Sequence, residues 1–484
     1  MIRKRKIKSA VSSDSINLIR LYKRKYNYES TATFIHPLQI SLAIALLCLL
    51  LRFPAFAQDN LTKYIKEGIE NNLVMKQKHI ALDKAMIALK NANSYFLPQV
   101  NLIGEYTSGD GGRSINLPIG DLLNPVYSTL NQLTTSNKFP QINNVKESFA
   151  PSNFYDAKIR TSMPVFDIDL FHNSNIKKEL ANVKEIEIDV YKRELIKEIK
   201  VAYYSFQSCL ELVKIYNSAN NLAHEAKRMY ESLVKNGSAL PAYLLKTESE
   251  IENIRAKILD AENKSNIARK YFNFLINRDL DTEILIDEIT NIDNEINIIN
   301  NLNIHSISQR EELVILNHAI DINKQVLSMQ QDYWLPKISF FLDLGSQESN
   351  FMVNKDSKYY LLGLRLNVPI FEGFRNSYKI EESYLEIRNA EYEYEKSKKQ
   401  LILSGSNAQI DLKYALQNYN LSIKQLKTAD SYNNLSIKGF KEGVNTFLET
   451  VDARNQLISS QLLVNINKFY ILIAKAKYDR EYNQ

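Results

Sequence analysis

Cysteine is almost missing from this chain of 484 residues, which contains only Cys48 and Cys209. Two cysteines can form at most one bridge, so the disulfide framework that stabilises many small secreted domains is excluded. If Cys48 is removed with the leader described below, Cys209 stands alone and no internal disulfide is possible.

Proline and glycine are also scarce, with 11 and 13 copies. They cluster in a few places and leave 165–236, 242–335 and 444–484 free of both. Helices in ordinary domains average only about 11–12 residues, and proline and glycine commonly mark where they end. The sequence therefore predicts long, thin helices rather than the several globular domains that its length alone would suggest.

Residue groupings that carry catalysis are missing as well. The six histidines are dispersed, and "HEAKR" (224–228) lacks the second histidine of a zinc-binding helix. The glycine cluster "GDGG" (109–112) lacks the Lys-Ser/Thr of a phosphate-binding loop. The methionines outside the first residues are scattered, so no dedicated copper or silver route is indicated. We predict a protein that is not an enzyme and holds no cofactor and no metal.

The amino terminus has the pattern of an export signal. A basic region precedes the apolar run "ISLAIALLCLLL" (40–51), which is too short to span a bilayer, and "AFA" (55–57) resembles a signal-peptidase site. We expect residues 1–57 to be a cleaved signal peptide. That segment holds ten of the 61 Lys and Arg and two of the 55 Asp and Glu, which leaves 51 basic against 53 acidic residues, a net charge of −2. This balance gives no indication of nucleic acid as a partner.

The remaining chain contains two copies of one sequence pattern. "FLPQVNL" (96–102) matches "WLPKISF" (334–340), and "MPVF" (163–166) matches "VPIFEGF" (368–374). Gly237 follows Pro164 by 73 residues, and Gly443 follows Pro369 by 74. Each half is predicted to run helix, strand, loop, strand, long helix, turn, long helix. We infer an internal duplication, with repeats at 58–276 and 306–484 joined by a link at 277–305.

Four short segments alternate between apolar and polar residues, as half-buried strands do. They are 99–106, 155–163, 337–345 and 358–368; the connections 107–154 and 346–358 are expected to be exposed loops. Strands of about ten residues with one apolar face fit transmembrane β-strands. Four strands cannot close a barrel, and an open edge in lipid leaves backbone groups unsatisfied, so chains must combine their sheets. Four prolines are expected at the strand–helix junctions, namely Pro98, Pro164, Pro336 and Pro369.

The long helices are predicted to stand in water. Residues 166–236 would extend about 105 Å as a helix, more than any bilayer, and they carry too much charge for lipid. Apolar residues at three- and four-residue spacings indicate a coiled-coil wall. Gly237 and Gly443 are expected to end such helices in a left-handed cap and to return the chain as a second helix.

These features resemble the TolC-like outer-membrane efflux factors over essentially all of 58–484. The resemblance implies a mainly α chain with a transmembrane β portion. Three copies would form a homotrimer in which four strands per chain make a 12-stranded β-barrel, continued by a coiled-coil α-barrel through the periplasm. The link 277–305 would then belong to the equatorial band of that tunnel.

The resemblance also implies the sites. Glu449 and Asp452 match the acidic rings of the periplasmic aperture, although a solvated surface pair has the same spacing. Phe440 would narrow this aperture, or serve ordinary hairpin packing. Asn445 and Tyr243 stand where the family has charged partners that hold the closed state, so hydrogen bonds or packing would replace that link. The hairpin tips would contact an adaptor protein; they comprise Asn236, Gly237, Ser238, Glu442, Gly443 and Val444.

The expected function is a passive exit duct in the outer membrane, extending into the periplasm, for a tripartite efflux pump or a type I secretion system. The expected partners are two further copies of the chain, a periplasmic adaptor protein, an inner-membrane RND or ABC transporter, and outer-membrane lipid. The alternative is a periplasmic coiled-coil adaptor or scaffold. Such a protein should carry one helical hairpin, whereas two hairpins and four amphipathic strands are predicted here.

Overall fold

The computed structural model describes residues 59–109, 111–149, 153–287 and 310–482. The expected leader 1–57 lies outside these residues, as does the link 277–305 beyond 287. Elements of the first half are α3 (Asn60–Asn71), α4 (Leu73–Ser94), β1 (Gln99–Thr107), β2 (Ser114–Leu117), α5 (Ile119–Thr134), β3 (Val145–Ser148), β4 (Phe154–Phe166), α6 (Ile168–Lys235) and α7 (Pro241–Leu275). Those of the second are α9 (Glu311–Gln331), β5 (Lys337–Ser349), β6 (Lys358–Asn367), α10 (Arg375–Lys441) and α11 (Phe447–Tyr482).

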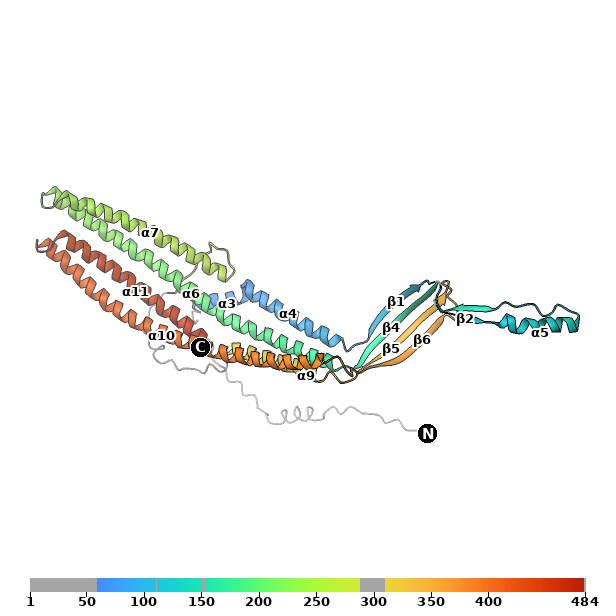
Figure 1. The fold of residues 1–484 in the computed structure, drawn as a ribbon. Helices are drawn as coiled ribbons and strands as arrows, with labels where there is room; N and C mark the ends of the chain where they lie inside the picture. The colour runs from blue at the N-terminus through green and yellow to red at the C-terminus, as the bar shows by residue number, and fades with distance from the viewer. Residues whose placement is uncertain (1–58, 110, 150–152, 288–309, 483–484) are drawn as a thin grey trace, which may run out of the picture. The chain divides into compact units, whose positions relative to one another are not determined.

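Two long helical hairpins, α6–α7 and α10–α11, lie side by side within the unit 59–484 (Figure 1). The helix α6 has 68 residues and α10 has 67, so each extends about 100 Å. Shorter helices complete the bundle: α4 packs on α6, and α9 packs on both α6 and α10. The predicted long helices are confirmed, and so is the repeated order of helix, strand, strand and two long helices.

The four predicted strands form one antiparallel sheet in the order β1-β4-β5-β6, beyond one end of the helices (Figure 1). Register places Leu102, Ile159, Leu344 and Tyr360 in one row across the sheet, and all four are exposed. The neighbouring row on the opposite face includes Arg160 and Asp343. Because side chains alternate between the two faces, one face of the sheet is apolar and the other carries charge.

Both hairpin turns have the same backbone structure. Gly237 and Gly443 adopt φ values of 70° and 75°, the left-handed region that glycine enters without steric cost. In the first turn the Ser238 amide donates to the carbonyl of Leu233 (2.8 Å), and in the second the Val444 amide donates to that of Gly439 (2.8 Å). These six-to-one bonds define Schellman motifs. The predicted left-handed caps are confirmed.

The prolines do not all lie where the junction argument put them. Pro98 and Pro336 directly precede β1 and β5. Pro164, however, is still paired with Ser339 inside β4, next to a register shift, and α6 starts four residues later. Pro369 does lie at the predicted junction between β6 and α10, although six residues before the helix begins. Neither therefore occupies a first helical turn, and Pro164 is accommodated at an irregularity of the sheet, where a missing amide is tolerated.

The connection 107–154 is more than a loop. It contains the antiparallel ribbon of β2 and β3 and the 16-residue helix α5. The expectation of an irregular loop rested partly on its four prolines. Pro125 nevertheless lies inside α5, and proline inside a helix removes one hydrogen bond and strains the preceding turn. Tertiary hydrogen bonds described below compensate for that loss.

The helices pack through small side chains in their interfaces. Fully or nearly fully buried alanines recur along three of the long helices, at Ala202, Ala219, Ala223, Ala415, Ala429, Ala453, Ala474 and Ala476. Small residues let helix axes approach closely and leave room for neighbouring knobs. Among the described helices, α11 alone is long and apolar enough by composition to cross a membrane. It packs along α10 and α6, so its apolar residues serve the bundle.

Candidate functional site at the hairpin tips

The tip surface consists of the two Schellman turns. All six predicted contact residues, 236–238 and 442–444, are exposed, and Val444 has 77% of its surface open to solvent. Both turns lie at the same end of the hairpins, at the opposite end from the sheet (Figure 1). The fold thus presents the two matching segments together, as two similar backbone turns.

An aromatic cluster joins the two hairpins just behind these turns. Tyr230 of α6 is 1% exposed and contacts Phe447 of α11 edge to face, with ring centroids 4.8 Å apart. Tyr243 of α7 stacks on Phe447 at 4.3 Å. Phe440 packs edge to face on Tyr230 at 5.7 Å. The Tyr243 ring therefore takes part in stacking where the family resemblance led us to expect a charged link.

Polar contacts cross the same interface. The Tyr230 hydroxyl and the Thr450 hydroxyl are hydrogen-bonded at 2.9 Å, and burial raises the pKa of Tyr230. Arg454 of α11 forms two bonds with Glu250 of α7, at 3.2 Å from Nε to Oε1 and 2.5 Å from Nη2 to Oε2. Their side chains are 9% and 10% exposed. A buried, two-pronged ion pair of this kind fixes relative orientation as well as distance.

The two acidic residues predicted for the aperture, Glu449 and Asp452, lie in different environments. The Glu449 carboxylate accepts hydrogen bonds from the amide (2.6 Å) and hydroxyl (3.0 Å) of Thr446, and the Glu449 amide donates back to that hydroxyl (3.3 Å). This is a capping box for α11. Asp452, one turn further on, is exposed, and no ion pair involves it within the described chain. Their role at an aperture stays a prediction.

Phe440 is half-buried in the aromatic cluster, which is the hairpin-packing alternative. Asn445 packs against Gly439, where an added Cβ would lie 2.9 Å from the Asn445 side chain. A cavity of about 360 Å³ lies beside this cluster, between α6 and the α10–α11 hairpin, lined by residues that include Met229, Asn433 and Ile437. Near the tips the two hairpins are thus joined to each other by packing, by the Tyr230–Thr450 hydroxyl bond and by the Arg454–Glu250 ion pair.

The sheet carries its own polar network on the charged face. Arg160 of β4 donates to both carboxylate oxygens of Asp343 on β5, at 2.7 and 2.6 Å. Asp343 is 1% exposed. Phe341, the one apolar exception in the alternation of its strand, lies beneath the Arg160 guanidinium, 5.7 Å from its ring centre. A cation over an aromatic face is attracted to it, which accounts for a phenylalanine on the charged side.

A dense group of charges surrounds the place where α9 begins and α11 ends. Arg310, 3% exposed, donates to Glu312 at 2.6 and 3.0 Å and to the Glu481 carboxylate at 2.9 Å. Burial by itself raises the pKa of Glu312, but the hydrogen bonds and charge of Arg310 outweigh it and lower that pKa. These pairs tie the carboxyl-terminal helix to the second repeat's first described helix.

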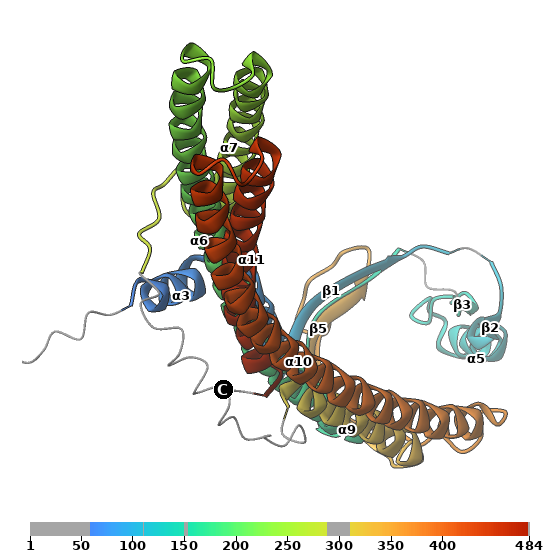
Figure 2. The same cartoon turned by 90° about the vertical axis from the view of Figure 1, so that its left-hand side faces the viewer.

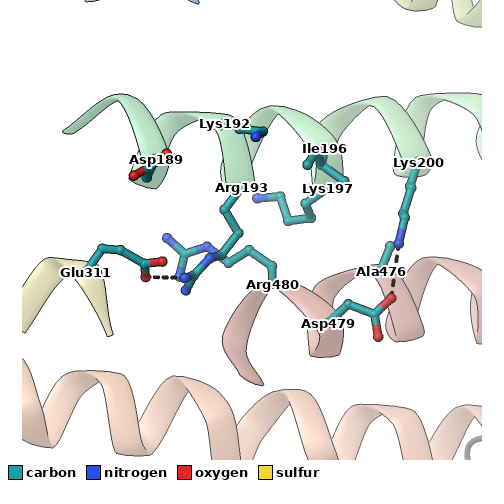
Figure 3. Close-up of a pocket in the computed structure, with 10 residues that line it drawn as sticks. All are labelled: Asp189, Lys192, Arg193, Ile196, Lys197, Lys200, Glu311, Ala476, Asp479 and Arg480. Carbon is teal, nitrogen blue, oxygen red and sulfur yellow. Dashed lines mark hydrogen bonds and ion pairs between the residues drawn. The ribbon is translucent and has the colours of Figure 1, made fainter. Parts of the chain in front are cut away.

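Beside this group lies a cavity of about 260 Å³, shown in Figure 3. Its lining is rich in basic residues, but Arg193 pairs with Glu311 and Lys200 pairs with Asp479 at 3.1 Å, as the dashed lines mark. Its charges are therefore largely engaged in joining helices. Across the described ranges, no three His, Cys, Asp or Glu side chains gather as a metal site would require.

Several of these residues were not singled out from sequence. The capping box has a readable signal, the Thr-x-x-Glu pattern "TFLE" at 446–449. Arg454 and Glu250 have none, because each stands in a charged helix among many similar residues, 204 positions from its partner. Arg160 and Asp343 lie on neighbouring strands, 183 positions apart in the sequence, and nothing in the sequence pairs one with the other.

The chain is similar to a known protein family in sequence and to known proteins in fold. Residues 306–466 match the family model described as "Outer membrane efflux protein". Among curated proteins, no sequence matches this chain significantly.

Solved structures of similar fold include outer-membrane proteins and channels. The chain resembles CusC with a TM-score of 0.71 at 13% identity, covering 88% of this chain and 92% of CusC. It resembles VceC from Vibrio cholerae (TM-score 0.69, 12% identity, 87% and 95% covered) and the CmeC outer membrane channel of Campylobacter jejuni (0.67, 14%, 87% and 85%). Residues 306–466 are thus similar to the outer membrane efflux protein family, and the described residues share the fold of these solved structures.

Proposed function

We propose that three copies of this chain form an outer-membrane exit duct that continues through the periplasm. The observation that carries the proposal is a four-stranded sheet that is apolar on one face, has both edge strands unpaired within the described residues, and runs into helices about 100 Å long. Residues of the apolar face such as Leu102 and Leu364 are 81% and 70% exposed, a surface suited to lipid.

The edges of the sheet support a closed barrel of several copies. Within the described chain β1 and β6 are the edge strands, and they run in opposite directions because each neighbouring pair in the sheet is antiparallel. Strand β6 of one copy can therefore pair antiparallel with β1 of the next. Each unpaired backbone group in lipid costs several kcal/mol, so closure is strongly favoured there. Three copies give the twelve strands of the proposed barrel.

The helical part offers a second surface for association. Exposed apolar residues recur on α10 at spacings of seven or fourteen within three groups, namely Tyr378, Leu385 and Tyr392, then Leu403 and Ile410, then Tyr414, Leu421 and Leu435. Heptad spacing keeps such residues on one helical stripe that a neighbouring helix can cover. In the proposed trimer this stripe faces the adjacent copy.

We assign the tip residues 236–238 and 442–444 to contact with a periplasmic adaptor, and Glu449 with Asp452 to an acidic ring at the periplasmic aperture. Six carboxylates around a constriction would favour cations. The contacts between hairpins, above all Arg454 with Glu250, would hold the aperture closed. An inner-membrane transporter of the RND or ABC type would supply energy, since no catalytic role is proposed for this chain.

Fractionation and crosslinking test this proposal. The mature protein is expected in the outer membrane as a detergent-stable trimer that forms channels in planar bilayers. Recovery of a soluble monomer from the periplasm, with no channel activity, would contradict the proposed function.

A further inference from the structure

Helix α5 stands on the ribbon of β2 and β3, beyond the end of the sheet that lies away from the helical hairpins (Figures 1 and 2). In the proposed orientation this end faces the cell exterior. The helix is not needed to connect β1 with β4, since the corresponding connection of β5 with β6 needs only residues 350–357.

One face of α5 is locked to the chain that follows it. Asn124 exchanges two hydrogen bonds with the backbone of Ile142, at 2.8 and 2.9 Å, and Asn131 exchanges two with the backbone of Phe139, at 2.7 and 3.1 Å. Tyr127 lies between them and packs on Phe139, with ring centroids 5.8 Å apart. Residues 124, 127 and 131 lie on one helical face, so α5 is rigidly held in one orientation.

The first turn of α5 also contacts the chain segment that follows the helix. Asp121 and Asn144 exchange two hydrogen bonds, from the Asp121 amide (3.0 Å) and from the Asn144 side chain (2.8 Å). Gly120 lies against the carbonyl of Ile142, where an added Cβ would approach to 2.4 Å. Only glycine permits this approach. These contacts stabilise a helix that contains Pro125.

The opposite face is apolar and open. Ile119, Leu122, Val126 and Leu133 are 36%, 68%, 52% and 76% exposed, and we call them the α5 seam. At 100° per residue they lie roughly opposite the locked face. Their spacings of three, four and seven are those of coiled-coil positions, with Thr129 at the intervening place. A soluble surface rarely exposes such a stripe on a rigid helix without a partner.

We propose that the α5 seam binds the same seam of the two other copies in the trimer and forms a three-helix cap over the outer mouth of the duct. This inference rests on the proposed function. Threefold symmetry brings three α5 helices to one end of one barrel, where tethering gives effective concentrations on the order of millimolar. Helices with heptad-spaced apolar residues can pack against one another along those residues. Lipid fits less well, because interfacial helices carry Lys or Arg on the polar face and Asp121 is the one charged residue of α5.

Cysteine crosslinking on intact cells tests the cap. In a Cys209→Ser background, Leu133→Cys and, independently, Val126→Cys are treated with a membrane-impermeant trivalent maleimide. Both are expected to give a covalent trimer. The matched control Gln132→Cys, adjacent in sequence and exposed but off the seam, is expected to leave monomers.

A separate measurement of trimer mass in detergent distinguishes the two proposals. A trimer whose seam cysteines link no better than the control would overturn the cap and leave the duct intact. Products larger than a trimer, or reaction of the seam cysteines with a lipid-phase reagent, would place the seam against another channel or the membrane and also overturn the cap. Absence of any trimer would remove the proposed function itself.

Discussion

The ion pair between Arg454 and Glu250 can be tested directly by mutation. Glu250→Gln removes one charge and leaves the Arg454 guanidinium unpaired in an environment where its side chain is 9% exposed. Breaking a buried pair by removing one partner costs about 3–5 kcal/mol. This cost applies to the state in which α7 and α11 are in contact, so it weakens the proposed closed state of the tips.

The expected consequence is a shift toward the open channel. A change of about 3 kcal/mol in a two-state equilibrium changes the ratio of open to closed forms by about a hundredfold, since each 1.4 kcal/mol is a factor of ten. Single-channel recording in planar bilayers should show this as longer open dwell times or larger conductance for Glu250→Gln. Arg454→Met should have a similar effect, because it leaves the Glu250 carboxylate buried.

The double variant provides the test of the reasoning. Replacing both partners by apolar residues, as in Glu250→Leu with Arg454→Met, removes both buried charges and is expected to be much less disruptive than either single change. Glu252→Gln is the matched control, because that residue is two positions away, 68% exposed in its side chain, and paired with the exposed Arg255 at the surface. Gating of Glu250→Gln equal to that of Glu252→Gln would refute the assignment of the pair to the closed state.

Three further predictions follow from the geometry. A cysteine at Leu364, on the apolar face, should react with lipid-soluble thiol reagents, and one at Arg365 with water-soluble ones; equal labelling by one reagent would contradict the face assignment. Glu449→Gln with Asp452→Asn should weaken cation selectivity with little change in thermal stability, because glutamine also completes a capping box, whereas Glu449→Ala should cost about 1 kcal/mol as well. The lowered pKa of Glu312 stabilises the fold at pH values above the unfolded pKa of about 4.3, and this contribution is lost as pH falls through the lowered value. Acid-unfolding curves of Glu312→Gln should therefore be shallower below pH 4.3 than those of the wild type, and identical curves would argue against the Arg310 pairing.

Much of the fold could be predicted because it depends on local physics. A helix 68 residues long is readable where proline and glycine are absent over 165–236. Strand faces are readable from alternation, and the turns from a glycine that must adopt positive φ. Each of these signals lies within a few residues of the structure that it specifies.

Other features depend on residues far apart in sequence and were decided only in three dimensions. The pairing of Arg454 with Glu250, the aromatic cluster around Tyr230, and the position of Phe341 beneath Arg160 all join separate repeats or strands. The sequence position of a charged or aromatic residue does not identify its partner, because many different pairs of residues would bury a similar surface area.

The helix α5 illustrates both sides of this division. Its prolines predicted a loop, since Pro125 removes a helical hydrogen bond. Hydrogen bonds from Asn124 and Asn131 to the returning chain offset that loss. Local sequence therefore determined the long helices, the strand faces and the tip turns. Tertiary contacts decided that a proline-containing connection becomes a rigid helix, and that its apolar side is left open for a partner.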